Sequence, residues 1–471
     1  MCMRLFLYLS VFILIFSCSN KTTQNIKPNI IYILADDLGY GDLGCYGQQT
    51  IQTPQIDKMA AEGIRFTDHY AGSTVCAPSR CALMTGLHTG HARVRGNANV
   101  PLKPDDTTVA ELLKKAGYTT ALIGKWGLGE AGSTGIPTRK GFDYFFGYLN
   151  QIRAHNSYPD YLWRNEEKVP LDNEIEIIQD TYARGIGSVA RNKKTHSHDL
   201  FTKEAFSFIE NNKDSSFFLY LAYTIPHANN EGIPMGQIGM EVPDLGIYKD
   251  KDWPEAQKAH AAMITYLDKD VGALLAKVRS LGIDQQTLVI FTSDNGPHAE
   301  GGANPDFFDS NGTLNGMKRD LYEGGIRVPM IAWWPGKITP GRESHHISAF
   351  WDFLPTACEI AHVNYQGKTD GISFLPELLG RDQIEHDFLY WEFFEAGGKR
   401  AIRKGNWKAV QNDMSSNPDA PIQVFNLSTD IGEARDISTE HPEVIDEMKN
   451  LIGSSRTPSE DFKFNFEKEI N

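Results

Sequence analysis

Short, almost continuously apolar runs alternate with amphipathic helical patterns along most of this 471-residue chain. The first run covers residues 29–35 and ends in Asp36-Asp37. This pattern, an apolar run followed by polar residues at its carboxyl end, is typical of a strand that is buried on both faces. Similar apolar runs occupy 119–124, 217–223, 287–292 and 328–334, and amphipathic patterns cover 54–62, 107–116 (with Asp105 and Asp106 as its expected cap), 197–211 and 254–281. The alternation predicts an α/β fold with a large, mostly parallel β-sheet sandwiched by helices.

The pattern changes after residue 386. Short strand-like runs separated by Gly, Asn and Pro turns follow at 388–393, 399–403, 407–410 and 423–427, and a helical pattern covers 442–452. We therefore expect two units. The first covers 28–386, and the second is a smaller α+β subdomain with an antiparallel sheet over 387–471.

The N-terminus resembles an export signal. Arg4 precedes an apolar run over 5–16, which is too short to span a membrane as a helix. The run ends in Leu-Ile-Phe-Ser-Cys, which resembles a bacterial lipobox with Cys18 as the lipidated residue. We expect a signal peptide over 1–17, a tether over 18–27 and a lipid anchor to the membrane at Cys18. The alternative is a plain signal peptide cut near Ser17. Both readings predict export, to the periplasm or the cell surface.

The net charge and the cysteine content exclude two classes of protein. The net charge of −14 argues against nucleic acid as a partner, because phosphate binding relies on a basic surface. Six cysteines in so long a chain do not form a disulfide scaffold. We expect Cys45, Cys81 and Cys358 to be buried and reduced, with a bridge between two of them as the alternative.

Two polar pairs follow predicted core strands. Asp36-Asp37 follows the first strand, and Asp294-Asn295 follows the strand at 287–292. Hard oxygen ligands of this kind suit Ca²⁺ or Mg²⁺, and the absence of His and Cys from both pairs disfavours zinc. Ligands in parallel sheets bind beyond the carboxyl ends of strands, so the two pairs predict one metal site.

The run Cys76-Ala77-Pro78-Ser79-Arg80 is unusual for a thiol. It has no neighbouring His to form a thiolate, and Cys81 is too far along the chain for a zinc pair. The non-functional alternative is that Cys76 is a buried free thiol at the start of a helix. The run resembles instead the Cys-x-Pro-Ser-Arg signature of type I sulfatases of the alkaline-phosphatase superfamily, including its Leu-Met-Thr-Gly tail. The resemblance extends from about residue 27 to the end of the C-terminal unit.

The resemblance implies an alkaline-phosphatase-like fold and a specific nucleophile. In that family a maturase oxidises the Cys to formylglycine (3-oxoalanine), whose hydrate attacks a sulfate ester. By resemblance, Cys76 is the modified residue. It would bind one Ca²⁺ together with the side chains of the two polar pairs, Asp36, Asp37, Asp294 and Asn295.

Cations and an acid are implied in the same way. Arg80 would steady the formylglycine hydrate, and Lys125 and Lys318, both in glycine-rich runs, would neutralise the sulfate. His227, in an Ile-Pro-His run after a strand, matches the family's general acid. For each Lys the alternative is a solvated surface charge, and for His227 it is a packed turn residue.

One position departs from the family. Many members have a His where Gly127 stands, and that His is thought to help break down the sulfated intermediate. His155 is our candidate replacement, with substrate binding as an equal alternative and a plain loop residue as a third reading. His198 and Asp199 are candidate substrate contacts, although Asp199 suits equally well a charge in the first turn of a helix.

The resemblance, together with the export signal, implies an exported, exo-acting sulfatase for a sulfated carbohydrate, either an algal polysaccharide or a glycosaminoglycan oligosaccharide. The aromatic and polar loop over 155–165 suits stacking on sugars, and it suits a packed structural loop equally well. Weaker candidates for sugar contacts are Trp391, Glu392, Glu395 and Lys399. The alternatives are a phosphonate or phosphate ester hydrolase of the same superfamily, and a catalytically silent glycan-binding lipoprotein in which Cys76 is never matured.

Overall fold

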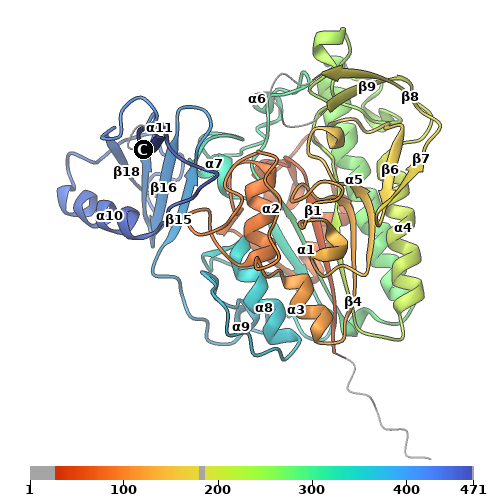
Figure 1. The fold of residues 1–471 in the computed structure, drawn as a ribbon, viewed down its shortest axis with the longest axis horizontal. Coiled ribbons are helices and arrows are strands. Elements are labelled where there is room, and N and C mark those ends of the chain that lie inside the picture. Colours follow the sequence, from red (N-terminus) through yellow and green to blue (C-terminus); the bar gives the residue numbers. More distant parts are fainter. Residues whose placement is uncertain (1–26, 180–185, 469–471) are drawn as a thin grey trace, which may run out of the picture.

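A ten-stranded mixed β-sheet lies at the centre of the computed structural model, which describes residues 27–179 and 186–468 (Figure 1). In spatial order its strands are β13 (Arg342–Ser344), β2 (Ile64–Phe66), β12 (Met330–Trp333), β11 (Thr287–Ser293), β1 (Asn29–Ala35), β10 (Phe217–Ala222), β4 (Thr119–Lys125), β5 (Tyr144–Tyr148), β6 (Tyr161–Arg164) and β7 (Glu167–Pro170). The five strands from β11 to β5 are mutually parallel, and β12, β6 and β7 pair antiparallel with their neighbours. The predicted fold class is confirmed.

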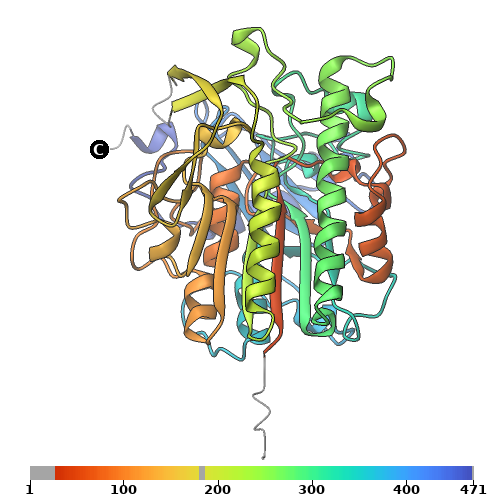
Figure 2. The ribbon, with the colours of Figure 1, turned by 90° about the vertical axis from the view of Figure 1, so that its right-hand side faces the viewer.

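Helices cover both faces of this sheet. One layer contains α2 (Cys76–Thr85), α3 (Val109–Lys115) and α8 (Phe353–Ile360), and the other contains α1 (Pro54–Glu62), α4 (Ser197–Asn212) and α5 (Glu255–Ser280). Figure 2 shows α4 and α5 side by side in front of the strands. Successive residues of β1 point to opposite layers, so Tyr32 packs with the first and Ile33 with the second. Because β1 is buried on both faces, its sequence is almost entirely apolar.

Smaller elements complete the fold. They are the paired strands β3 (His69–Tyr70) with β14 (Ser348–Ala349) and β8 (Glu174–Gln179) with β9 (Ile186–Asn192), and the short helices α6 (Pro305–Phe308), α7 (Glu323–Ile326), α9 (Leu375–Leu378) and α11 (Asn465–Lys468). The four helices predicted in the first unit are present within two residues of their expected ends.

The predicted cap of α3 is wrong. Thr108 caps this helix: its Oγ1 accepts a hydrogen bond from the Glu111 backbone N–H, and the Glu111 carboxylate accepts one from the Thr108 N–H. The Asp106 carboxylate accepts instead from the backbone of Lys103, 2.7 Å away. A reciprocal box of this kind satisfies two free donors at once, so it takes the position that Asp105 and Asp106 were expected to hold.

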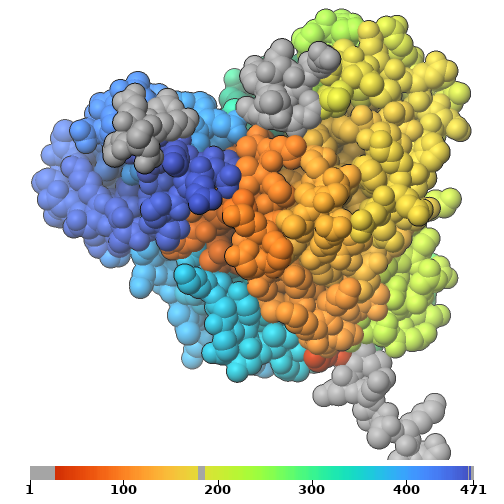
Figure 3. All heavy atoms as spheres, viewed as in Figure 1, coloured from red at the N-terminus to blue at the C-terminus, as the bar shows by residue number. Residues whose placement is uncertain are grey.

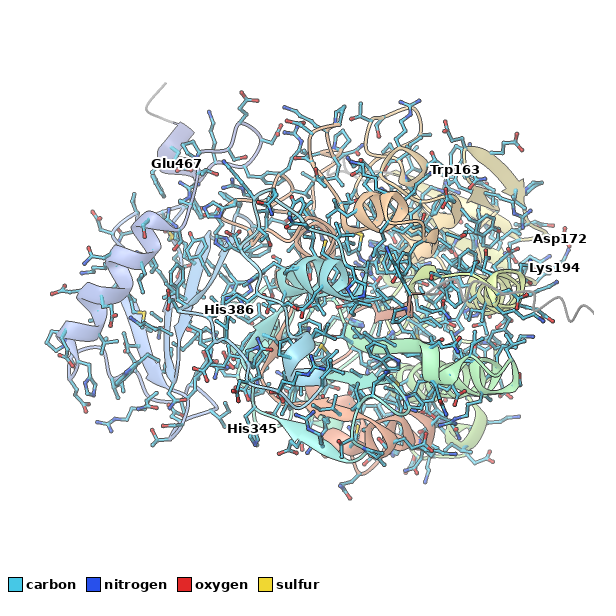
Figure 4. The ribbon with its side chains drawn as sticks, turned by 90° about the horizontal axis from the view of Figure 1, so that it is seen from below. Trp163, Asp172, Lys194, His345, His386 and Glu467 are labelled. Atoms are coloured by element: carbon cyan, nitrogen blue, oxygen red, sulfur yellow. The ribbon has the colours of Figure 1, made fainter. Side chains whose placement is uncertain are left out.

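The C-terminal unit is a four-stranded antiparallel sheet with a helix packed on it. Its strands are β15 (Leu389–Phe393), β16 (Lys399–Lys404), β17 (Trp407–Gln411) and β18 (Ile422–Asn426), and its helix is α10 (Pro442–Ser454). The predicted antiparallel subdomain is confirmed. His386, labelled in Figure 4, lies where the two units meet, with its Nε2 2.8 Å from Asp352 Oδ1. The boundary between 386 and 387 itself stays a prediction.

The two units share a buried contact. In Figure 3 the blue C-terminal unit lies directly against the orange part of the chain. Trp391 is fully buried there, and its indole N–H donates to the backbone oxygen of Ala71, 3.0 Å away. The Glu392 carboxylate, also fully buried, accepts from Arg95 at 2.8 Å and from Arg456 at 2.9 Å. The expectation that Trp391 and Glu392 contact sugar is therefore corrected, because both are enclosed between the units.

We predict that Glu392→Gln lowers the free energy of unfolding by about 3–5 kcal/mol, because it leaves the buried Arg95 without its counter-charge. Urea denaturation measures the change. The matched control is Glu440→Gln, which removes the partner of Arg435 in an exposed pair and should cost at most ~1 kcal/mol. Equal losses in the two variants would contradict this account of the contact.

Cysteines and membrane-crossing segments bear on the remaining fold predictions. Cys45, Cys81 and Cys358 are free thiols, as expected. Cys81 and Cys358 are buried, but Cys45 is only half-buried, which corrects the expectation for that residue. Among the described residues, no helix combines the length and the apolar character that crossing a bilayer requires. The predictions for the signal peptide, Cys18 and most of the tether fall on residues 1–26, outside the described part of the chain.

Candidate active site

Polar residues gather at the carboxyl edge of the parallel strands. Asp36-Asp37 follow β1, Asp294-Asn295 follow β11, and Lys125 is the last residue of β4. Since neighbouring parallel strands end at the same edge, residues far apart in the sequence meet there. The Asp37 backbone N–H donates to Asp294 Oδ1 at 3.1 Å, which joins the ends of the two strands directly.

The four predicted metal ligands form one buried cluster. Asp36, Asp37, Asp294 and Asn295 are all fully buried. Asn295 Nδ2 donates to Asp37 Oδ1 at 2.8 Å, so its amide orientation is fixed. Asn295 Oδ1 is buried and has no hydrogen-bond partner in the described part of the chain. A buried acceptor without a donor, among three carboxylates, fits a hard cation such as Ca²⁺.

The electrostatics of the cluster point the same way. Burial and the neighbouring Asp36 charge raise the pKa of Asp294 to about 7. Burial opposes ionisation of Asp36 too, but the Lys125 charge lowers the pKa of Asp36 well below its usual range. Carboxylates held this close repel one another, and a divalent cation between them would relieve the repulsion.

Arg80 and Lys125 flank the cluster. The Arg80 guanidinium donates to Asp294 Oδ2 from Nη2 at 2.8 Å and from Nε at 3.1 Å, and to the Lys125 backbone oxygen at 2.8 Å. Lys125 Nζ lies 2.7 Å from Asp36 Oδ2. Both side chains are buried, so their charges act in a medium of low dielectric constant.

Cys76 is the first residue of α2, and its side chain points into the same cluster. Its Sγ donates a hydrogen bond to Asp36 Oδ1 at 3.3 Å. Burial, together with the Asp36 charge, raises the pKa of the Cys76 thiol well above its ordinary value. An unmodified Cys76 is therefore a protonated thiol, which is a poor nucleophile.

Lys318 and His227 form the next layer of the site. Lys318 Nζ lies 2.8 Å from Asp37 Oδ2, 2.9 Å from Glu300 Oε2 and 3.1 Å from His227 Nε2. The other ring nitrogen of His227, Nδ1, donates to the backbone oxygen of Ala228 at 2.6 Å. This bond leaves Nε2 facing the ammonium group of Lys318. Burial and the Lys318 charge lower the pKa of His227 well below its usual value.

A cavity of about 340 Å³ opens over these groups. Its wall includes Cys76, Lys125, His227 and Lys318. His155 also lines it, and the rings of His155 and His227 are stacked with their centres 4.7 Å apart. Four predicted catalytic residues and the predicted replacement for the missing histidine thus share one cavity. Arg80 lies behind them against the carboxylates.

His198 and Asp199 lie elsewhere, which corrects their expected role as substrate contacts. They belong to the first turn of α4. His198 is fully buried, and its Nε2 is 3.1 Å from Asp270 Oδ2 on α5. The Asp199 carboxylate accepts from the Tyr266 hydroxyl, also on α5. Neither lines the cavity, because α4 directs both side chains toward the neighbouring helix.

Glu395 and Lys399 act behind the cavity. The Glu395 carboxylate accepts from the backbone N–H of Asn97, a cavity residue, at 3.0 Å. Lys399 Nζ donates to the backbone oxygen of Arg319 at 2.8 Å. Neither of the two is part of the cavity wall. Glu395 and Lys399 were expected to contact sugar, but in the structure they hold the backbone of two cavity residues, Asn97 and Arg319.

Sequence reasoning missed two carboxylates of the site. Glu300 binds Lys318 and Arg319, and Glu231 lies 3.2 Å from His155 Nδ1. Glu300 stands only five residues after Asn295, on the same loop, so its position was a usable signal. Glu231 had no such signal.

Comparison with known proteins agrees with this geometry. The family model described as Sulfatase matches residues 28–363, and the model described as N-sulphoglucosamine sulphohydrolase, C-terminal, matches residues 316–457. An N-acetylgalactosamine-6-O-sulfatase of Bacteroides thetaiotaomicron is 30% identical, over 92% of this chain and 93% of its own. Human arylsulfatase A is 32% identical, over 90% of this chain and 87% of its own.

Solved structures give the same result. The crystal structure of Ps i-CgsB in complex with k-i-k-neocarrahexaose is 28% identical, with a TM-score of 0.74, and the match covers 94% of this chain and 96% of that one. The family model covers well over half of the chain, and its match includes every predicted metal ligand and catalytic residue. The chain therefore belongs to the sulfatase family, a family of sulfuric ester hydrolases.

Proposed function

We propose that this protein is an exported sulfatase that removes sulfate from a sulfated carbohydrate, using formylglycine at position 76 and one Ca²⁺. The observation that carries the proposal is the place of Cys76. The cysteine of the Cys-x-Pro-Ser-Arg run lies 3.3 Å from a buried carboxylate cluster, beneath a cavity that two lysines enter. The relatives support a carbohydrate substrate, because one is named for a sulfated amino sugar and another was solved with a neocarrahexaose.

Two groups would complete the site. Ca²⁺, held by Asp36, Asp37, Asp294 and Asn295, would polarise a sulfate oxygen and favour ionisation of a neighbouring hydroxyl. The hydrated aldehyde derived from Cys76 would supply that hydroxyl. The high pKa of the unmodified thiol and its bond to Asp36 support the need for such a conversion.

The buried cations bind and orient the sulfate. Lys125 and Lys318 both line the cavity and bind different carboxylates of the cluster, Asp36 and Asp37 respectively. Their ammonium groups neutralise the ester's negative charge and the charge that grows on the sulfate oxygens as the S–O bond breaks. Arg80 holds Asp294 in place, and its hydrogen bond to the Lys125 backbone fixes the end of β4.

Proton transfer to the departing alcohol is assigned to His227. A sugar alkoxide is a poor leaving group and needs a proton as it leaves. Nε2 of His227 lines the cavity, 3.1 Å from Lys318 Nζ. As the acid, His227 would enter the reaction protonated at both ring nitrogens and give up the proton at Nε2, while Lys318 keeps its own proton and stays charged. The bond from Nδ1 to Ala228 fixes the ring for this transfer.

His155 is the candidate for proton removal in place of the histidine missing at Gly127. Its Nδ1 lies 3.2 Å from Glu231, an arrangement in which the carboxylate orients the ring and leaves Nε2 free to accept a proton. Substrate binding by His155 remains the alternative role, since the same nitrogen could accept from a sugar hydroxyl.

The test is desulfation of a panel of defined sulfated saccharides by protein co-expressed with a formylglycine-generating maturase. Sulfate release, measured by ion chromatography, is expected for at least one sulfated galactose, N-acetylgalactosamine or glucosamine, and matched phosphate esters should react far more slowly. Faster release of phosphate than of sulfate would favour the ester hydrolase alternative. Glycan binding without any release, and with an unmodified thiol at position 76, would favour the binding-protein alternative.

We predict that His227→Asn separates substrates by their leaving groups. For a saccharide sulfate, kcat should fall by about 10²–10⁴-fold, because the alkoxide loses its acid. For an aryl sulfate the loss should be at least tenfold smaller, because a phenolate leaves without a proton. His69→Asn is the control: this imidazole is buried too, but it lies outside the cavity and bonds to Ser348. Equal losses of kcat on the saccharide and the aryl sulfate would show that His227 is not the general acid.

Export and anchoring are part of the proposal. Lipidation at Cys18 would attach the enzyme to a membrane, in the periplasm or at the cell surface, where polymeric substrates are met. Cys18→Ala should move the protein from the membrane fraction to the soluble exported fraction. Cleavage near Ser17 in the wild type, with no lipid on residue 18, would favour the plain signal peptide.

A further inference from the structure

The loop after β5 brings a side chain into the space that residue 127 leaves empty. Trp126 and Gly127 continue the ladder with β5 through N–H bonds to the backbone oxygens of Tyr148 and Leu149, at 2.9 and 3.0 Å. This register brings Gln151 against Gly127. A Cβ on residue 127 would lie 2.1 Å from Gln151 Nε2 and 2.7 Å from its Cδ. Gln151 thus occupies the volume into which a side chain at position 127 would extend.

The amide of Gln151 is buried but unbonded. Nε2 and Oε1 are both inaccessible to solvent and have no hydrogen-bond partner in the part of the chain that the structure describes. Gln151 nevertheless lines the cavity that contains Cys76 and Lys125. A buried amide with both ends unsatisfied weakens the fold. Because the Gln151 side chain borders the cavity, a rotation of its end group would bring the amide to a hydrogen-bonding partner in that cavity.

The chemistry of the group limits that partner. A carboxamide carries no charge and does not titrate near neutral pH, so it cannot take over proton removal from a histidine. It offers two N–H donors and one acceptor, which match a sugar hydroxyl or ring oxygen. Under the proposed function the charged sulfate is bound by Lys125 and Lys318, which line the same cavity.

We propose that Gln151 is a substrate-binding residue that hydrogen-bonds the sugar carrying the sulfate, in the place that Gly127 vacates. The proposal rests on the proposed function. In this arrangement proton removal stays with a titratable group such as His155, and Gln151 contributes a neutral, pH-independent contact.

The decisive variant is Gln151→Met, which keeps the length of the side chain against Gly127 and removes its hydrogen bonds. On a saccharide substrate of the panel, kcat/KM should fall about 10–100-fold, with the shape of the pH profile unchanged. On an aryl sulfate, which has no sugar hydroxyls, the loss should be at least fivefold smaller. The melting temperature of the substrate-free protein should stay the same or rise, because a buried unsatisfied amide is replaced by an apolar group.

A second route displaces the amide without changing it. Gly127→Ala adds a Cβ where the Gln151 amide lies, at a backbone φ of +82°. It should reproduce the selective loss on the saccharide, although here the melting temperature should fall because of the strained backbone. Gln49→Ala, in a different part of the surface, is the control and should leave all rates unchanged.

Binding provides a readout without turnover. In a Cys76→Ala background, calorimetric affinity for the same saccharide should fall about tenfold when Gln151→Met is added. A lower melting temperature for Gln151→Met, with equal losses on saccharide and aryl sulfate, would show a structural role and overturn the proposal. Unchanged saccharide kinetics would overturn it too. Failure of the wild type to desulfate any saccharide would instead count against the proposed function, and the melting temperature would still test the amide's burial.

Discussion

Cys76→Ala is expected to abolish turnover, with kcat falling by more than about 10⁴-fold, as removal of a covalent nucleophile does in other hydrolases. The structure gives the physical reason. The thiol is buried against the Asp36 carboxylate, which keeps it protonated, so no thiolate chemistry can substitute for the converted residue. Wild-type protein produced without a maturase should be as inactive as the variant.

The control for this prediction lies five residues further along the same helix. Cys81 is buried in the apolar core beneath α2 and lines no part of the cavity. Cys81→Ala should keep full turnover with a modest loss of stability. Mass spectrometry of the peptide that contains residue 76, after trapping with a hydrazine, should detect an aldehyde only in matured protein. Full activity of Cys76→Ala would refute the mechanism.

Much of the fold could be predicted because burial on both faces leaves a simple record in the sequence. The runs that became β1, β4, β10 and β11 have apolar centres with polar residues only toward their ends, and each is a central parallel strand. An apolar run does not show whether the strand pairs parallel or antiparallel with its neighbours. The run at 328–334 looks alike, yet β12 pairs antiparallel with β11. An apolar run reveals burial, whereas its direction depends on where the chain goes between strands.

The site was predictable where strand ends or a dense motif place residues. Asp36 and Asp294 follow adjacent strands, so their meeting follows from a parallel sheet. His198 shows the opposite case. A histidine that opens a helix looked suited to a substrate, but helix geometry turns it toward Asp270 on α5. Gln151 was missed for a related reason: its role depends on the register between β4 and β5, which no local pattern records.

Lys318→Ala is expected to lower kcat for a saccharide sulfate by about 10²–10³-fold, the usual cost of removing one fixed charge that stabilises a transition state. Burial disfavours its charged form, but the Asp37 and Glu300 carboxylates more than compensate and raise the pKa of Lys318 above its ordinary value. The ammonium group therefore stays charged across any usable assay pH, and its loss should affect the rate at every pH.

Lys408 provides the matched control, because it is also a fully buried lysine bound to two carboxylates. Its Nζ lies 2.7 Å from Glu323 and 3.4 Å from Glu433, outside the cavity. Lys408→Ala should lower the free energy of unfolding by about 3–5 kcal/mol while the folded fraction keeps its kcat. Lys318→Ala should instead lower kcat and leave the free energy of unfolding nearly unchanged, if Ca²⁺ is present to balance the charge of Asp37. Loss of rate in both variants, in proportion to their loss of stability, would mean that Lys318 supports the fold and not the reaction.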